Sequence, residues 1–119
     1  MNKVLFIEDD IATQKIYREK FSKDFEVIFA LTGVLGASMA VKEKPDVIIL
    51  DIILAGGLSG FEALKEIKKH SESKNIPVIV LTNLESQEKI AKEGGAVECL
   101  VKANTSIGEV DKFIRKHLP

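Results

Sequence analysis

One segment, residues 46–51 (DVIILD), restricts the possible folds of this chain more than any other. Its continuous apolar run lies between Pro45 and a glycine-rich stretch at residues 56–60. Such a run is typical of a strand buried on both faces of a parallel sheet. Asp51 then emerges at the carboxyl end of that strand, where open α/β sheets hold their ligands. Because Asp is also common in turns and caps, Asp51 alone leaves both interpretations open.

The rest of the chain alternates between apolar runs and amphipathic segments, which predicts five strands and five helices. The expected strands are residues 3–7, 26–30, 46–51, 77–81 and 98–101, and the expected helices are residues 11–21, 33–44, 59–70, 84–93 and 106–118. Asp10 is the expected N-cap of the first helix, while Ser59 with Glu62 and Ser106 with Glu109 have capping-box spacing. This order predicts an α/β fold with a doubly wound parallel sheet.

Two helices stand out by their composition. The segment 33–44 is apolar or small nearly all round, which predicts burial on more than one side, with Leu35 and Met39 facing outward. These two residues form either a partner-facing patch or scattered exposed apolar positions. The segment 84–93 has few apolar residues, so we expect it to be the least firmly packed helix.

Length and charge limit the class of protein. A chain of 119 residues suits a single domain, and its net charge of -1 gives no general attraction to nucleic acid or to a membrane. It has neither a signal-peptide layout nor an apolar run of membrane-spanning length, so we expect a cytoplasmic protein. The one cysteine, Cys99, cannot form an internal disulfide and is expected to be a small core residue.

Polar residues follow four of the expected strands at the point where each strand ends. They are Glu8, Asp9, Asp51, Thr82 and Lys102. Because the carboxyl ends of parallel strands share one edge of a sheet, these side chains are expected to converge. Three carboxylates without His or thiolate form a hard oxygen site suited to Mg²⁺ and a substrate phosphate. Each residue alone also has an ordinary interpretation as a cap or a surface charge.

Together these motifs make the chain resemble, over essentially its whole length, the receiver domain of two-component response regulators. The matching features are residues 4–10 (VLFIEDD), Asp51, residues 59–62 (SGFE), Thr82 and Lys102. The combination is highly specific, although no single feature is. The resemblance implies a flavodoxin-like sheet with strand order 2-1-3-4-5.

The resemblance also implies a function for the cluster. Asp51 would take a phosphoryl group from a histidine kinase or a phosphotransfer protein. Mg²⁺ would be bound by Asp9, Asp51 and the main-chain carbonyl of Ile53, and by Glu8 through water. Lys102 would neutralise charge on the transferring group, while Thr82 would offer a hydroxyl to one of its oxygens. The phosphorylated domain would then signal to a downstream protein through altered contacts.

The chain departs from the family pattern at several positions. Cys99 and Ala103 stand where an aromatic residue and a proline are usual, and the loop 54–58 lacks the usual proline. Before Ala103 a cis peptide bond would cost roughly 2.5–4 kcal/mol, so we expect a trans bond. Bulky Ile53 and Leu84 would flank the path of the attacking water, which predicts slow hydrolysis of the acyl phosphate.

Three classes of function remain open at this point. The leading hypothesis is a single receiver domain spanning residues 1–119 without an output domain, which has no enzymatic activity beyond its own phosphorylation and dephosphorylation. A second is a receiver-fold adaptor that binds partners without phosphorylation. The third, a phosphate-processing enzyme on a related fold, lacks support because D-x-D, G-x-G-x-x-G and G-x-x-x-x-G-K-[ST] motifs are absent.

Overall fold

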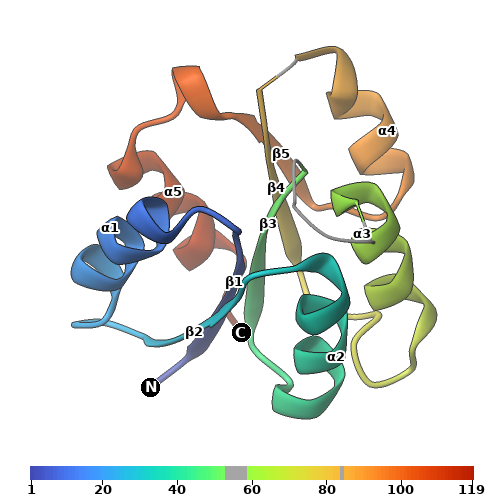
Figure 1. The fold of residues 1–119 in the computed structure, drawn as a ribbon, viewed down its shortest axis with the longest axis horizontal. Helices are drawn as coiled ribbons and strands as arrows, with labels where there is room; N and C mark the ends of the chain where they lie inside the picture. The colour runs from blue at the N-terminus through green and yellow to red at the C-terminus, as the bar shows by residue number, and fades with distance from the viewer. Residues whose placement is uncertain (53–58, 84) are drawn as a thin grey trace.

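The computed structural model describes residues 1–52, 59–83 and 85–119 and shows five parallel strands in the order β2-β1-β3-β4-β5 (Figure 1). The strands are β1 (Lys3–Ile7), β2 (Glu26–Ala30), β3 (Val47–Asp51), β4 (Val78–Thr82) and β5 (Glu98–Val101). The α-helices are α1 (Ile11–Phe21), α2 (Gly33–Glu43), α3 (Gly60–Lys69), α4 (Glu88–Glu93) and α5 (Ile107–Lys116). The flavodoxin-like strand order and the five helices expected from the sequence are confirmed.

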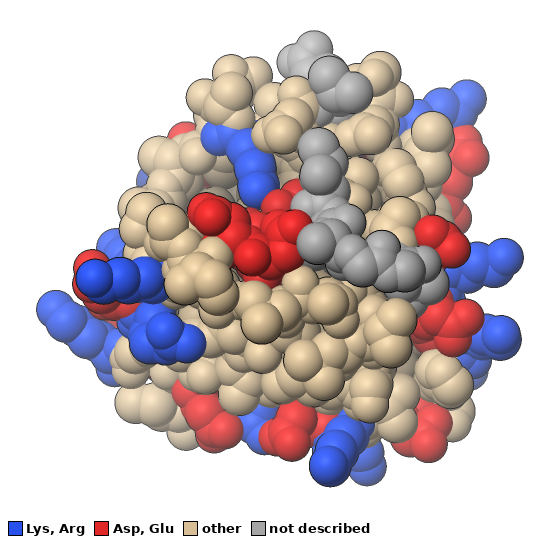
Figure 2. All heavy atoms as spheres, viewed as in Figure 1, with Lys and Arg blue, Asp and Glu red and all other residues tan. Residues whose placement is uncertain are grey.

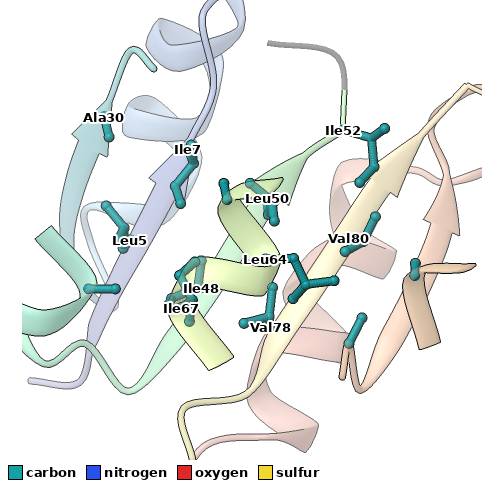
Figure 3. Packing of buried hydrophobic residues seen from close by; sticks show 14 residues of the cluster. Leu5, Ile7, Ala30, Ile48, Leu50, Ile52, Leu64, Ile67, Val78 and Val80 are labelled. Atoms are coloured by element: carbon teal, nitrogen blue, oxygen red, sulfur yellow. The ribbon is translucent and has the colours of Figure 1, made fainter. Parts of the chain in front are cut away.

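The sheet is covered on both faces, with α1 and α5 on one side and α2, α3 and α4 on the other (Figure 1). Alternate residues of each strand therefore enter different cores. Leu5, Ile48 and Val80 pack with Leu64 and its neighbours under α2 to α4 (Figure 3). The other core contains the aromatic side chains of α1 and its surroundings. All five residues of β3 are buried, as the apolar run predicts.

Strand register brings the expected site residues to one edge of the sheet. Asp51 pairs with Leu81 of β4, and Thr82 pairs with Val101 of β5, directly before Lys102. The site residues at the ends of these strands are far apart in the sequence but therefore lie at the same level of the sheet.

The start of α3 lies against the backbone that follows Asp51. The N–H of Gly60 donates to the carbonyl oxygen of Ile52 at 3.0 Å. A Cβ atom at position 60 would lie only 2.3 Å from the Cα of Ile52, so only glycine allows this approach. The capping box of Ser59 and Glu62, predicted from the sequence, fixes the helix at that point.

Local signals also set the ends of the other helices. The Asp10 carboxylate accepts a hydrogen bond from the Thr13 N–H at 3.1 Å, and Ser106 forms its capping box with Glu109. Both caps were expected from the sequence. None of the helices in the described ranges is long and apolar enough to cross a membrane.

One expectation about α2 is wrong, and the length of α4 needs correction. Met39 does not face outward: it is half-buried against the core, while Val34 is exposed beside Leu35. The reason is the close packing of α2 on β1 and α3, which orients the helix about its own axis. The helix expected to end near Glu93 does end there, but its α-helical part is shorter than expected, since a 3₁₀ turn at Glu85–Gln87 precedes the six-residue α4. Cys99 is half-buried and packs against the core under α2 to α4.

Candidate functional site

A lysine joins two carboxylates at the carboxyl edge of the sheet. The Nζ atom of Lys102 lies 2.7 Å from Oδ2 of Asp51 and 3.3 Å from Oε1 of Glu8. Figure 2 shows acidic side chains gathered at the centre of this face of the molecule, with a basic side chain against them. The contact joins residues that are 94 and 51 positions apart, so it depends on the strand order.

Glu8 is nearly inaccessible to solvent, with 3% of its surface exposed. Its Oε2 atom accepts the N–H of Asp10 at 3.1 Å, and its main-chain carbonyl accepts the Gln14 side chain at 2.7 Å. The pKa of Glu8 is raised to about 7. Burial is the main cause and the charge of Asp51 adds to it, while the hydrogen bond from the Asp10 N–H acts in the opposite direction. Glu8 therefore titrates near neutral pH, far above an ordinary glutamate.

Asp9 completes a group of three carboxylates. One oxygen atom from each of Glu8, Asp9 and Asp51 lies within 4.8 Å of the others. The donor set is entirely oxygen, and it contains carboxylates of different exposure, which suits a hard divalent cation such as Mg²⁺ that keeps part of its hydration shell. The residues therefore fit a magnesium ion.

The charge of Lys102 is stabilised by its two partners. Burial lowers the pKa of Lys102, but the hydrogen bond and the negative charge of Asp51, together with Glu8, outweigh it and raise the pKa overall. The side chain is 30% exposed, so its head reaches the carboxylates from the surface. A fixed ammonium group of this kind neutralises anionic oxygens without proton exchange.

Thr82 ends β4 and is 1% exposed. Its hydroxyl donates a hydrogen bond to the side-chain oxygen of Gln87, in the 3₁₀ turn before α4. Sequence reasoning identified Thr82 but missed Gln87. Nothing in the local sequence pattern distinguishes this glutamine from other residues of a polar segment.

Several expected site features lie outside the described residues: the Ile53 carbonyl, the loop 54–58 and Leu84. By contrast, the region after Lys102 is described. It forms a short 3₁₀ turn, Lys102–Asn104, and contains no cis peptide bond, so the expectation of a trans bond before Ala103 is confirmed. The expected convergence at one edge of the sheet agrees with where the structure places the five side chains, which are Glu8, Asp9, Asp51, Thr82 and Lys102.

The fold and this edge together define a class of protein. A sequence model described as response regulator receiver domain matches residues 4–113, and the chain therefore belongs to the response regulator receiver domain family. It is a signalling domain of two-component systems, and its acidic cluster is consistent with phosphoacceptor signalling.

Individual relatives match this chain over most of its length and most of their own. The chain is 34% identical to protein PilH of Pseudomonas aeruginosa over 82% of this chain and 84% of that one. It is 31% identical to sporulation initiation phosphotransferase F of Bacillus subtilis, over 98% and 94%. Among solved structures, chemotaxis response regulator CheY4 of Vibrio cholerae superposes with a TM-score of 0.88 at 30% identity, covering 99% of both chains.

Proposed function

We propose that this chain accepts a phosphoryl group on Asp51 from the phosphohistidine of a histidine kinase or phosphotransfer protein, in a Mg²⁺-dependent reaction. The observation that carries the proposal is the position of Lys102, whose ammonium group contacts both Asp51 and Glu8. One relative, sporulation initiation phosphotransferase F, has a name that supports the same class of reaction.

In the proposed step a carboxylate oxygen of Asp51 attacks the phosphorus atom. The new P–O bond forms as the P–N bond to the donor histidine breaks, and the bonding electron pair remains on the imidazole nitrogen. Lys102 offsets negative charge on the phosphoryl oxygens, which is the main requirement for this transfer. The 6% exposure of Asp51 limits competing water at the nucleophile.

We assign the metal site to Asp9 and Asp51, with the main-chain carbonyl of Ile53 and with Glu8 through water. Mg²⁺ bound there supplies positive charge that stabilises the transferring phosphoryl group. The all-oxygen donor set of the three carboxylates supports this assignment. The role of the chain itself is to hold the carboxylates of Glu8, Asp9 and Asp51 close together at the carboxyl edge of the sheet.

The phosphorylated domain signals through altered protein contacts. An acyl phosphate at Asp51 presents new acceptor oxygens, and Thr82 at the end of the neighbouring strand carries the hydroxyl that we assign to one of them. The Thr82 hydroxyl then leaves Gln87 for a phosphoryl oxygen, which changes the conformation of the segment after β4. We propose slow hydrolysis of the acyl phosphate and no catalysis on a separate substrate.

Labelling with acetyl phosphate tests the site. We expect the wild-type chain to gain one phosphoryl group by mass spectrometry in Mg²⁺ and none in EDTA, and Asp51→Asn to gain none in either. Asp24→Asn is the matched control, because Asp24 pairs with Arg115 on the surface. Lys102→Gln should slow labelling by at least about tenfold through lost charge stabilisation.

Two outcomes would contradict the proposal. Labelling of Asp51→Asn at the wild-type rate would place the phosphoacceptor elsewhere. Absence of Mg²⁺-dependent labelling in the folded wild-type chain, by acetyl phosphate and by a panel of phosphorylated histidine kinases, would favour a receiver-fold adaptor instead.

A further inference from the structure

A groove of about 510 Å³ runs between α3 and α4. Leu64 is buried at its base, and a Cβ atom on Gly94 would touch that side chain at 3.0 Å. Phe61 is half-buried on the α3 side, and Ile90 on α4 is 55% exposed. The groove therefore has an apolar base and one large apolar side chain left in solvent.

The charged side chains that line this groove are all basic. Three lysines, Lys65, Lys68 and Lys69, line it, and among the described residues lining it none is acidic. This is unexpected for a chain whose net charge is -1. The neighbouring groove between α2 and α3 is different, because Lys42 and Glu66 both line it.

Contacts within the fold explain only part of this lysine content. Lys68 is used internally, since its ammonium donates to the carbonyl oxygens of Lys74 and Ile76 at 3.1 and 2.8 Å. Lys65 and Lys69 are exposed and one helical turn apart, a spacing at which like charges destabilise a helix. The Lys69 ammonium lies 3.8 Å from a carboxylate oxygen of Glu66, whereas Lys65 precedes the last turn of α3, where the helix dipole favours lysine.

We propose that the groove between α3 and α4 is a docking surface for an acidic amphipathic helix of a partner protein. Two adjacent helices with an apolar base match the way in which a groove accepts the apolar face of a third helix. Leu64 and Ile90 take the apolar side chains of that helix, and Lys65 with Lys69 pair with its carboxylates. The proposal does not depend on phosphorylation of Asp51.

The test uses an NMR titration of the ¹⁵N-labelled full chain with two synthetic probes. One is a 14-residue helical peptide with leucines at i, i+3, i+4 and i+7 spacing and glutamates elsewhere, and the other has lysines in place of the glutamates. We expect the acidic probe alone to bind, with shifts confined to α3, α4 and the turn at Gly94 and Gly95.

Charge-reversal variants then distinguish binding at this groove from non-specific electrostatic attraction. Lys65→Glu with Lys69→Glu should weaken binding of the acidic probe roughly tenfold or more, because two attractive contacts become repulsive. Lys15→Glu with Lys23→Glu makes the same change of charge at two exposed positions of the opposite layer and should leave binding unchanged. Ile90→Ser, at a residue that the fold leaves exposed, should weaken binding at least about fivefold through lost apolar burial.

Other outcomes would overturn the proposal. These are shifts centred outside α3 and α4, equal loss of binding in both charge-reversal variants, or equal binding of the lysine probe. Binding of anionic lipid vesicles or duplex DNA that requires Lys65 and Lys69, without binding of the acidic peptide, would assign the surface to a different class of ligand. Self-association through the same residues would assign it to a second copy of the chain.

Discussion

The hydroxyl of Thr82 donates a hydrogen bond to the side-chain oxygen of Gln87 and so joins the end of β4 to the turn that precedes α4. The threonine is buried, whereas α4 has only six residues and a single buried side chain, Ala91. A change at Thr82 is thereby connected to a weakly packed helix. Cys99 stands where the family usually has an aromatic residue. It is half-buried and compact, so it cannot relay a change by moving between buried and exposed positions as an aromatic ring does.

We predict that this hydrogen bond relays phosphorylation. Beryllofluoride with Mg²⁺ should draw Thr82 away from Gln87 and increase amide exchange in residues 86–93, because α4 loses its link to β4. In Gln87→Ala, exchange there should already be fast without beryllofluoride and should change little on its addition. Ser86→Ala is the neighbouring control. Unaltered exchange in this segment of the wild-type chain would refute the relay.

The raised pKa of Glu8 predicts a stability that falls with pH in the absence of metal. The folded chain holds the Glu8 proton up to about pH 7, whereas the unfolded chain releases it near the ordinary value of 4.5. This contribution is complete below the unfolded pKa and is lost as pH rises through the folded pKa. We expect a loss of about 1–3 kcal/mol between pH 4.5 and 8, since one pKa unit corresponds to roughly 1.4 kcal/mol.

Urea unfolding in EDTA at several pH values measures this dependence. Glu8→Gln should flatten the slope and make the chain more stable than wild type at pH 8, because no charge is buried. Glu109→Gln is a suitable control, since Glu109 is a surface capping residue. A wild-type stability that rises over the same pH interval would contradict the assignment.

The same proton predicts a pH dependence of Mg²⁺ binding. A metal favours the deprotonated carboxylate, so binding releases the Glu8 proton below pH 7 and becomes weaker there. Calorimetric titrations should show affinity rising by up to about tenfold between pH 6 and 7, with little change above pH 8. Glu8→Gln should bind more weakly with a smaller pH dependence. An affinity independent of pH in the wild type would show that Glu8 is not linked to the metal.

Substitution of glycine by alanine should have opposite effects on stability at two positions. A Cβ atom at Gly36 would lie within 2.9 Å of three atoms of the buried Ile7 side chain, so Gly36→Ala should destabilise the fold by about 1–3 kcal/mol. At Gly108, in the first turn of α5, the nearest atom would be 3.9 Å away. Gly108→Ala should stabilise by roughly 0.5–1 kcal/mol through helix propensity. Thermal unfolding of both variants checks the pair, and a neutral Gly36→Ala would contradict the observed packing.

The strands, the helices and the candidate site residues were predictable from the sequence because their signals are local, whereas the strand order followed from the resemblance to the receiver family. The apolar run 46–51 indicates a strand buried on both faces, and Asp51 must follow it. Parallel strands share an edge, so the position of Lys102 after its own strand sufficed to predict convergence. Capping boxes are also local, since their two residues are three positions apart.

Other properties depended on contacts between distant segments. The burial that raises the pKa of Glu8 is a product of tertiary packing, and Lys102 reaches Glu8 over 94 positions of sequence. The orientation of α2, which turns Met39 inward and Val34 outward, follows from its packing on β1 and α3. Gln87 lies only five positions after Thr82, but no local sequence pattern indicates that their side chains meet. Sequence periodicity determines which residues share a face, but only tertiary packing decides what each face meets and how far each charge is removed from water.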